Sequence, residues 1–351
     1  MKAGREGRWA RTALWAAAGL GIVIAIGCFA RIQFVDACFL AVFTLLQPAL
    51  GSMFLILIHR MTGGQWGRLL RAQLHAGAML APWIWLLLLP FLFLPRPGGE
   101  MHITHDSLAL YMGAPMQGAR FAIIWIALLL LSWALRRSET HPEMRWVGPG
   151  GFIGLVFLLH LAAADWLFTL QPGWYSTGFP IVWMSGQTVS ALAAALAFAI
   201  RTGADPGATG SSGRPEGIDW GNLLMAAVLF WSYVAFTHFL IMWMGNISQE
   251  IAWYTQRATT AWEWIIGALA VFHLGFPLLL LFFRGFKRSR RALGTLATVL
   301  VALQAVHTAW IILPSLGSRG ATLALAVAFA VAALAVFFAV YTQLAHLIRD
   351  S

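Results

Sequence analysis

One carboxylate stands in a stretch of sequence that is apolar enough to lie within a lipid bilayer. Asp165 follows the apolar residues 161–164 and precedes the Trp- and Pro-rich segment WLFTLQPGWYST at 166–177. A charged side chain at membrane depth is costly, and it persists mainly where it pairs, lines a wet cavity or transfers protons. Asp165 could therefore accept hydrogen bonds from indole and amide groups of the following loop, or take part in proton transfer. Both roles stay open at this point.

Further titratable residues lie in the apolar stretches or at their outer edge. Together with Asp165, the candidates for a proton path are His160, His238, Glu250, Glu263 and His307. Histidine titrates near neutrality, so these groups could relay protons from the midplane, near His273, to the outer surface if their helices share a bundle. The alternative for each histidine is an interhelical hydrogen bond. For Glu263, the alternative is a favourable position in the first turn of a helix, near its positive end.

The composition predicts an all-α integral membrane protein to hold these residues. Of the 351 residues, 60% are hydrophobic and only 10% are charged, and the mean hydropathy is +0.75. A helix needs roughly 20 apolar residues to span the hydrocarbon core. Ten stretches qualify, and no alternating strand pattern of a membrane barrel accompanies them. The predicted spans are 9–29, 36–58, 70–94, 115–135, 148–170, 178–200, 220–243, 260–283, 293–313 and 321–347.

The basic residues predict the orientation of these spans. If the N-terminus is cytoplasmic, that side carries 18 of the 23 Lys and Arg residues. Such an excess indicates that both termini are cytoplasmic. The net charge of +10 is then explained by topology and by attraction to anionic lipid headgroups, and it does not indicate nucleic-acid binding.

The spacing of the spans suggests one polytopic membrane domain over residues 1–351. Within it we expect an N-terminal helix (1–35), a first four-helix bundle (36–177), a second four-helix bundle (178–315) and a C-terminal helix (316–351). Bundles of this kind can hold polar sites in their cores. The first and last helices would then be peripheral.

The residue types argue against a metal or redox cofactor held by this chain. Bundle cytochromes need histidines that face each other across helices, whereas here the membrane histidines occur singly, one on each of four spans. Cys28 and Cys38 form no CxxC or CxxCH pattern. Nucleotide-binding motifs are also missing from the sequence.

Three separated segments carry a resemblance to a known family. They are HRMTGGQWGRLLR at 59–71, the Asp165 segment, and HFLIMWMGNISQEIAWYTQR at 238–257. They resemble the F subunit of alternative complex III, a respiratory quinol:cytochrome c oxidoreductase, which is similar to the membrane subunits of polysulfide reductase type. The matching motif residues are Gly63, Gly64, Trp66, Asp165, Trp166, Trp174, Asn246, Glu250, Trp253 and Tyr254. Gln171 and Gln249 replace acids of the family pattern.

The resemblance implies a multi-pass subunit of the bacterial inner membrane. Its expected partners are a sister membrane subunit that binds quinol, an iron–sulfur subunit, and multihaem and monohaem cytochrome c subunits, with haem c and iron–sulfur clusters confined to these partners. The chain itself would serve as a scaffold, with a possible proton path or quinol contact of its own. The alternative is a secondary transporter, whose helices would be interrupted around a midplane substrate site.

The topology can be tested with reporter fusions. We expect a fusion at Ser212 to report a cytoplasmic location and a fusion at Gly99 to report the opposite side, because the basic residues place these loops on different faces. Activity of paired phosphatase and fluorescent reporters measures the two locations. Two fusions that report the same side would contradict the predicted map.

Overall fold

The computed structural model describes residues 35–93, 110–111, 113–208, 213, 215–258 and 261–316, with single positions between 331 and 348. Within these residues the secondary structure is helical, and eight helices are long and apolar enough to cross a membrane. The chain is therefore an all-α, multi-pass membrane protein. The predicted span 9–29 lies outside the described residues, and the predicted span 321–347 lies largely outside them.

The eight described spans match the eight middle predictions in order. They are Val35–Thr62, Leu70–Leu92, Ala114–Arg137, Pro142–Leu170, Phe179–Arg201, Glu216–Gly245, Trp262–Phe282 and Arg290–Leu316. The fourth span begins earlier than predicted, because a short turn of 3-10 helix, η2 (Pro142–Trp146), runs directly into α5 (Val147–Trp166). The length of an apolar run locates a span well, but it does not show how far the helix continues into the polar residues on either side.

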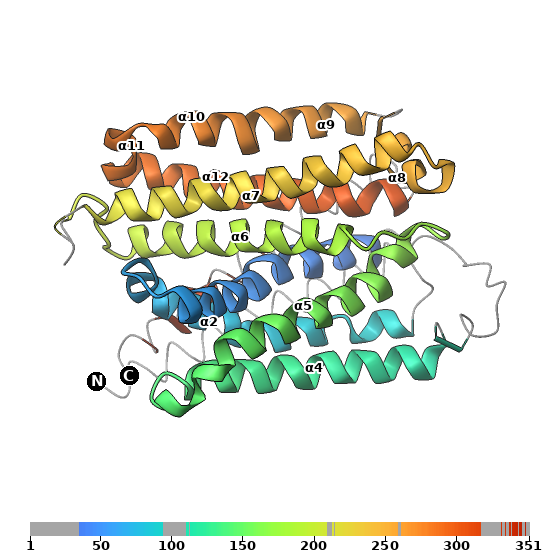
Figure 1. The fold of residues 1–351 in the computed structure, drawn as a ribbon, viewed down its shortest axis with the longest axis horizontal. Helices are drawn as coiled ribbons and strands as arrows, with labels where there is room; N and C mark the ends of the chain where they lie inside the picture. Colours follow the sequence, from blue (N-terminus) through green and yellow to red (C-terminus); the bar gives the residue numbers. More distant parts are fainter. Residues whose placement is uncertain are drawn as a thin grey trace.

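The other described elements are α-helices and short 3-10 or π-helical turns. They are α2 (Trp66–Leu86) with η1 (Leu89–Leu92), α4 (Ala114–Arg137), η3 (Phe168–Leu170), α6 (Phe179–Arg201), α7 (Glu216–Gly245), α8 (Ser248–Ala258), α9 (Trp262–Leu269), η4 (Ala270–Gly275), α10 (Phe276–Phe282), α11 (Arg284–Arg288), α12 (Arg290–Ile312) and η5 (Leu313–Leu316). The short helices α8 and α11 connect consecutive spans at opposite ends of the molecule (Figure 1).

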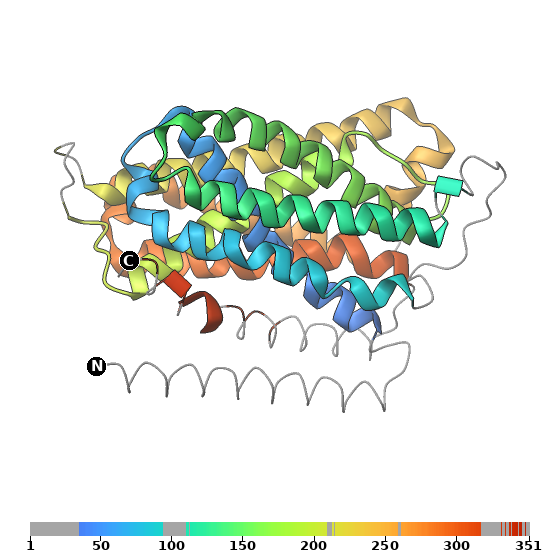
Figure 2. The ribbon, with the colours of Figure 1, turned by 90° about the horizontal axis from the view of Figure 1, so that it is seen from below.

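The long helices lie side by side along the long axis of the molecule (Figures 1 and 2). On one side of α6 lies a group in which α4 packs against both α2 and α5. On the other side, α7 packs against α10 and α11, and α12 packs against α9. Helix α6 contacts α2 from the first group as well as α7 and α12 from the second. It therefore joins the two groups.

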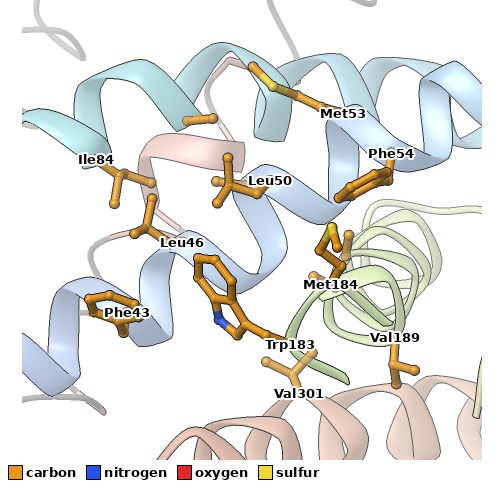
Figure 3. Close-up of a cluster of buried hydrophobic side chains, with 14 of the residues drawn as sticks. Phe43, Leu46, Leu50, Met53, Phe54, Ile84, Trp183, Met184, Val189 and Val301 are labelled. Atoms are coloured by element: carbon orange, nitrogen blue, oxygen red, sulfur yellow. The ribbon is translucent and has the colours of Figure 1, made fainter. Parts of the chain in front are cut away.

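The core lies where the helix Val35–Thr62 meets α6. Phe43, Leu46 and Leu50 of the first helix face Trp183 and Met184 of α6 (Figure 3), and Phe43 and Trp183 have ring centroids 5.7 Å apart. Gly51 brings the two backbones together, because a Cβ built there would overlap the carbonyl oxygen of Gln187. Small residues let membrane helices approach closely, and van der Waals contact then stabilises the pair.

Substitution of Gly51 by alanine tests this close approach. Gly51→Ala should push the helix Val35–Thr62 and α6 apart and cost about 1–3 kcal/mol, the usual range for an overfilled core. The measurement is the melting temperature of the purified chain in detergent, followed by fluorescence-detected size exclusion. Gly154→Ala is the matched control, since a Cβ at Gly154 of α5 meets nothing within 4 Å, and it should melt at or above the wild-type temperature. Equal melting of wild type and Gly51→Ala would contradict the packing.

Candidate functional site at the outer end of the helices

Asp165 is buried in an ion pair with an arginine of the neighbouring helix. Arg120 Nε lies 3.0 Å and 2.9 Å from the two carboxylate oxygens of Asp165, and Arg120 Nη2 lies 2.7 Å from Oδ1. The side chains of Arg120 and Asp165 are only 10% and 2% exposed. Two-point contact of this kind is the strongest geometry between a guanidinium and a carboxylate. The pair therefore ties the outer ends of α4 and α5 together.

The same arginine also fastens the loop that precedes α4. Arg120 Nη1 donates to the carbonyl oxygen of Tyr111 at 2.7 Å, and the guanidinium lies 3.9 Å from the centroid of the Tyr111 ring. The sequence suggested that Asp165 accepts hydrogen bonds from indole and amide groups of the loop that follows it. The main partner of Asp165 is instead a side chain 45 residues away. The clue in the sequence was Arg120 itself, a lone cation at the start of a long apolar run.

A hydrogen-bonded chain centred on His238 lies at the same end of the molecule. Ser176 Oγ is 2.7 Å from His238 Nε2, and the Tyr254 hydroxyl is 2.6 Å from His238 Nδ1. Tyr254 belongs to α8, and burial raises the pKa of its hydroxyl above the ordinary range. The loop after α5, the C-terminal part of α7 and α8 thus meet through one buried histidine.

An aromatic stack closes this end of the second helix group. The rings of Trp174 and Trp253 are stacked with centroids 5.2 Å apart, and Trp174 Nε1 donates to the carbonyl oxygen of Glu250 at 2.9 Å. Phe179 contacts both tryptophan rings edge to face. Two of the three segments that carry the family resemblance therefore form one buried unit.

Arg257 anchors the stack to the end of α12. Its guanidinium lies 3.6 Å from the Trp253 ring centroid and donates to the carbonyl oxygens of Trp253 and Ile311, each at 2.7 Å. Burial lowers the pKa of Arg257 to about 9, so the side chain remains a cation at neutral pH. Carbonyl oxygens at helix ends are natural partners for such a cation. No feature of the sequence by itself predicted this role for Arg257.

A second polar cluster lies deeper among α7, η4 and α12. Trp231 contacts His273 and His307, with ring centroids 4.2 Å and 5.0 Å apart, and Gln304 Nε2 is 3.4 Å from His307 Nδ1. His273 lies in a turn of π-helix, η4, a geometry that often marks functional sites. Within the described part of the chain, neither ring nitrogen of His273 has a hydrogen-bond partner.

Other predicted site residues lie apart from these clusters. His160 is half-buried, and its Nδ1 is 2.9 Å from the carbonyl oxygen of Val156 in the same helix. Glu263 is exposed in the first turn of α9, and Glu250, in the first turn of α8, meets Trp174 through its backbone. The structure therefore does not bring these three side chains into the clusters around His238 and His273.

The other motif residues shape helix ends. The helix Val35–Thr62 ends at the turn of Gly63 and Gly64, whose φ angles of 71° and 104° favour glycine. Trp66 packs edge to face on His59, with ring centroids 4.9 Å apart. Asn246 ends α7 in the left-handed conformation, with φ 47°, which asparagine tolerates well. Trp166 is buried against Phe39. These positions need particular residues for structural reasons.

The opposite end of the molecule holds a polar cavity of about 790 Å³. Glu139 on its wall lies 2.7 Å from Arg71 Nη2 and 3.1 Å from His75 Nε2. Burial would raise the pKa of Glu139, but the hydrogen bond to His75 and the charges of His75, Arg71 and Arg60 together hold it below its ordinary value. Glu139 is therefore an ionised centre that joins α2, the end of α4 and the helix Val35–Thr62.

No family model matches the chain. No curated protein matches it either. Within the described residues, no group of three or more His, Cys, Asp or Glu side chains is arranged to hold a metal ion.

Removal of one partner of the Arg120–Asp165 pair should cost more than removal of both. Asp165→Leu leaves the Arg120 guanidinium buried without its carboxylate, a change that typically costs about 3–5 kcal/mol. The double variant Arg120→Met/Asp165→Leu should recover most of this loss, because no charge then remains buried. Thermal melting and the yield of folded chain measure the effect. If the double variant is as unstable as Asp165→Leu, the ion pair does not hold the two helices.

Proposed function

We propose that the chain is an integral membrane subunit of a quinol-oxidising respiratory complex of the alternative complex III type, in a bacterial inner membrane. The observation that supports this best is the meeting of the segments 165–177 and 238–257 in one buried unit. The Trp174–Trp253 stack and the Ser176–His238–Tyr254 chain hold that unit together. Segments that resemble one family and also pack on each other are explained together by descent from that family.

Within such a complex the chain acts first as a scaffold. Its motif residues hold an ion pair, a π-stack, a glycine turn and a helix cap, all of which fix the ends of helices. A firm outer surface suits the docking of iron–sulfur and cytochrome c subunits that carry the electrons. The proposed arrangement has two four-helix bundles that share a seam at α6, two peripheral helices and cytoplasmic termini.

A proton path is the second candidate role, and it belongs to the histidines of the second bundle. His273 and His307 are buried beside unsatisfied polar atoms of Gln304 and Trp231, an arrangement that suits the entry of water. His238 lies further out and connects to the outer end through Tyr254. Asp165, engaged with Arg120, is a weaker candidate than the sequence alone suggested.

Purification from native membranes tests the assignment. A tagged chain extracted in mild detergent should carry multihaem cytochrome c and iron–sulfur subunits, identified by haem staining and mass spectrometry. The same chain expressed alone should show no haem absorbance, because its membrane histidines occur singly on four spans and Trp231 packs against both His273 and His307. Isolation of the chain without such partners would favour the transporter alternative, and stoichiometric haem in the isolated chain would overturn our interpretation of its histidines.

The proton path can be tested in the assembled complex with His273→Gln. This change keeps a polar side chain in η4 but removes the titrating ring, so quinol-driven proton release should fall by roughly a hundredfold, as for loss of an acid–base group. Release is measured with a pH dye in proteoliposomes, beside electron transfer to the acceptor. His160→Gln is the matched control, since His160 bonds only to its own helix in the described contacts. Normal proton release in a fully assembled His273→Gln complex would leave the chain as a scaffold.

A further inference from the structure

An apolar groove runs along the outside of the second helix group, between α10 and α12. It has a volume of about 530 Å³. Phe272, Phe276 and Leu280 line one wall, and Thr295 and Val299 line the other. Phe272 and Phe276 are about half exposed, and their rings are stacked with centroids 5.5 Å apart. The groove is therefore open to the hydrocarbon region that surrounds the protein.

One end of the groove is basic. Arg291 and Ser289 lie at that end, beside α11 and its sequence RGFKR. Arg291 and Val299 are eight residues apart on α12, so the apolar part extends about 12 Å from the charge at 1.5 Å per residue. The groove is therefore complementary in shape and polarity to a molecule that has an apolar chain and a polar group at one end.

The cations at this end divide into two kinds. Lys287 is buried and donates to Asn222 of α7, and Arg290 Nε donates to the carbonyl oxygen of Ile200. These two side chains hold the turn onto the protein. Arg284, Arg288 and Arg291 are exposed, and none of them forms an ion pair with any residue that the structure describes. Their charges face outward at the end of the groove.

We propose that this groove binds an anionic phospholipid. One acyl chain lies along the phenylalanines, and the phosphate lies against Arg291 with Arg284 and Arg288 nearby. The basic residues place this end on the cytoplasmic side, where anionic headgroups concentrate and basic pockets between helices bind them. A neutral quinone or an apolar partner helix would leave the three exposed arginines without a counterion. The lipid would stabilise the α10–α11–α12 turn from outside.

Native mass spectrometry of the full chain tests the site. The chain is reconstituted with equal amounts of phosphatidylglycerol and phosphatidylcholine, extracted in mild detergent and weighed with its retained lipid. Wild type should retain phosphatidylglycerol in preference, and Arg291→Gln should retain about fivefold less, the effect of one basic residue near an anionic headgroup. Ala292→Trp fills the groove without a change in charge and should also reduce retention.

Two control variants distinguish lipid binding in this groove from non-specific attraction of anionic lipid to basic residues of the protein. Arg145→Gln removes an exposed basic residue that is predicted on the same side but lies in η2, away from the groove. Ile153→Trp adds bulk to an exposed position of α5. Both should retain phosphatidylglycerol as wild type does. Equal retention of the two lipids by wild type, equal loss in Arg145→Gln and Arg291→Gln, or full retention by Ala292→Trp would each overturn the proposal.

Discussion

The structure depends on the close approach of the helix Val35–Thr62 to α6. Both helices are almost wholly covered by other parts of the chain, so they form the inner pair around which the other described spans are arranged. The absence of a side chain at Gly51 lets the backbone of one helix touch the carbonyl of Gln187 on the other. In a bilayer, where lipid tails are as apolar as leucine, such packing contributes more to helix association than the hydrophobic effect does.

A second constraint acts at the helix ends, where polar groups meet an apolar medium. Backbone carbonyls and charged side chains in such a place need partners inside the protein. Arg257 donates hydrogen bonds to the carbonyl oxygens of Trp310 and Ile311 at the end of α12, and to that of Trp253 in α8. Arg120 of α4 donates hydrogen bonds to the carboxylate of Asp165 in α5 and to the carbonyl oxygen of Tyr111. Both arginines are thus structural cations that fix the helix ends they contact.

The interior of the second helix group contrasts with these satisfied ends. Polar atoms of His273, Trp231 and Gln304 are buried without hydrogen-bond partners among the described residues, and unsatisfied groups of this kind call for an explanation in function. His273 lies in the π-helical turn η4 and packs against Trp231. The polar groups at these helix ends are therefore hydrogen-bonded, whereas several buried polar atoms in the second helix group lack a partner among the described residues.

The sequence by itself determined the class of protein and the position of the eight described spans. Apolar run length is a local property, and roughly 20 residues suffice for one crossing. It also singled out Gly63, Gly64 and Asn246 as motif residues, and the left-handed conformations that they adopt depend mainly on the residue itself. The short helices α8 and α11 were not predicted, because each is too short and too polar to stand out from a loop.

Only the tertiary structure decided which polar residues meet. Asp165 lies 45 residues from Arg120, and Ser176 lies 62 residues from His238. No periodicity within one helix encodes such pairs, because they depend on which helices are neighbours and how each is rotated about its axis. The same applies to Glu263, which the sequence placed in the first turn of a helix but whose exposure on α9 only the packing decided. The depth of a residue follows from its position along a span. The direction in which its side chain points relative to other helices follows from packing, which depends on the whole chain.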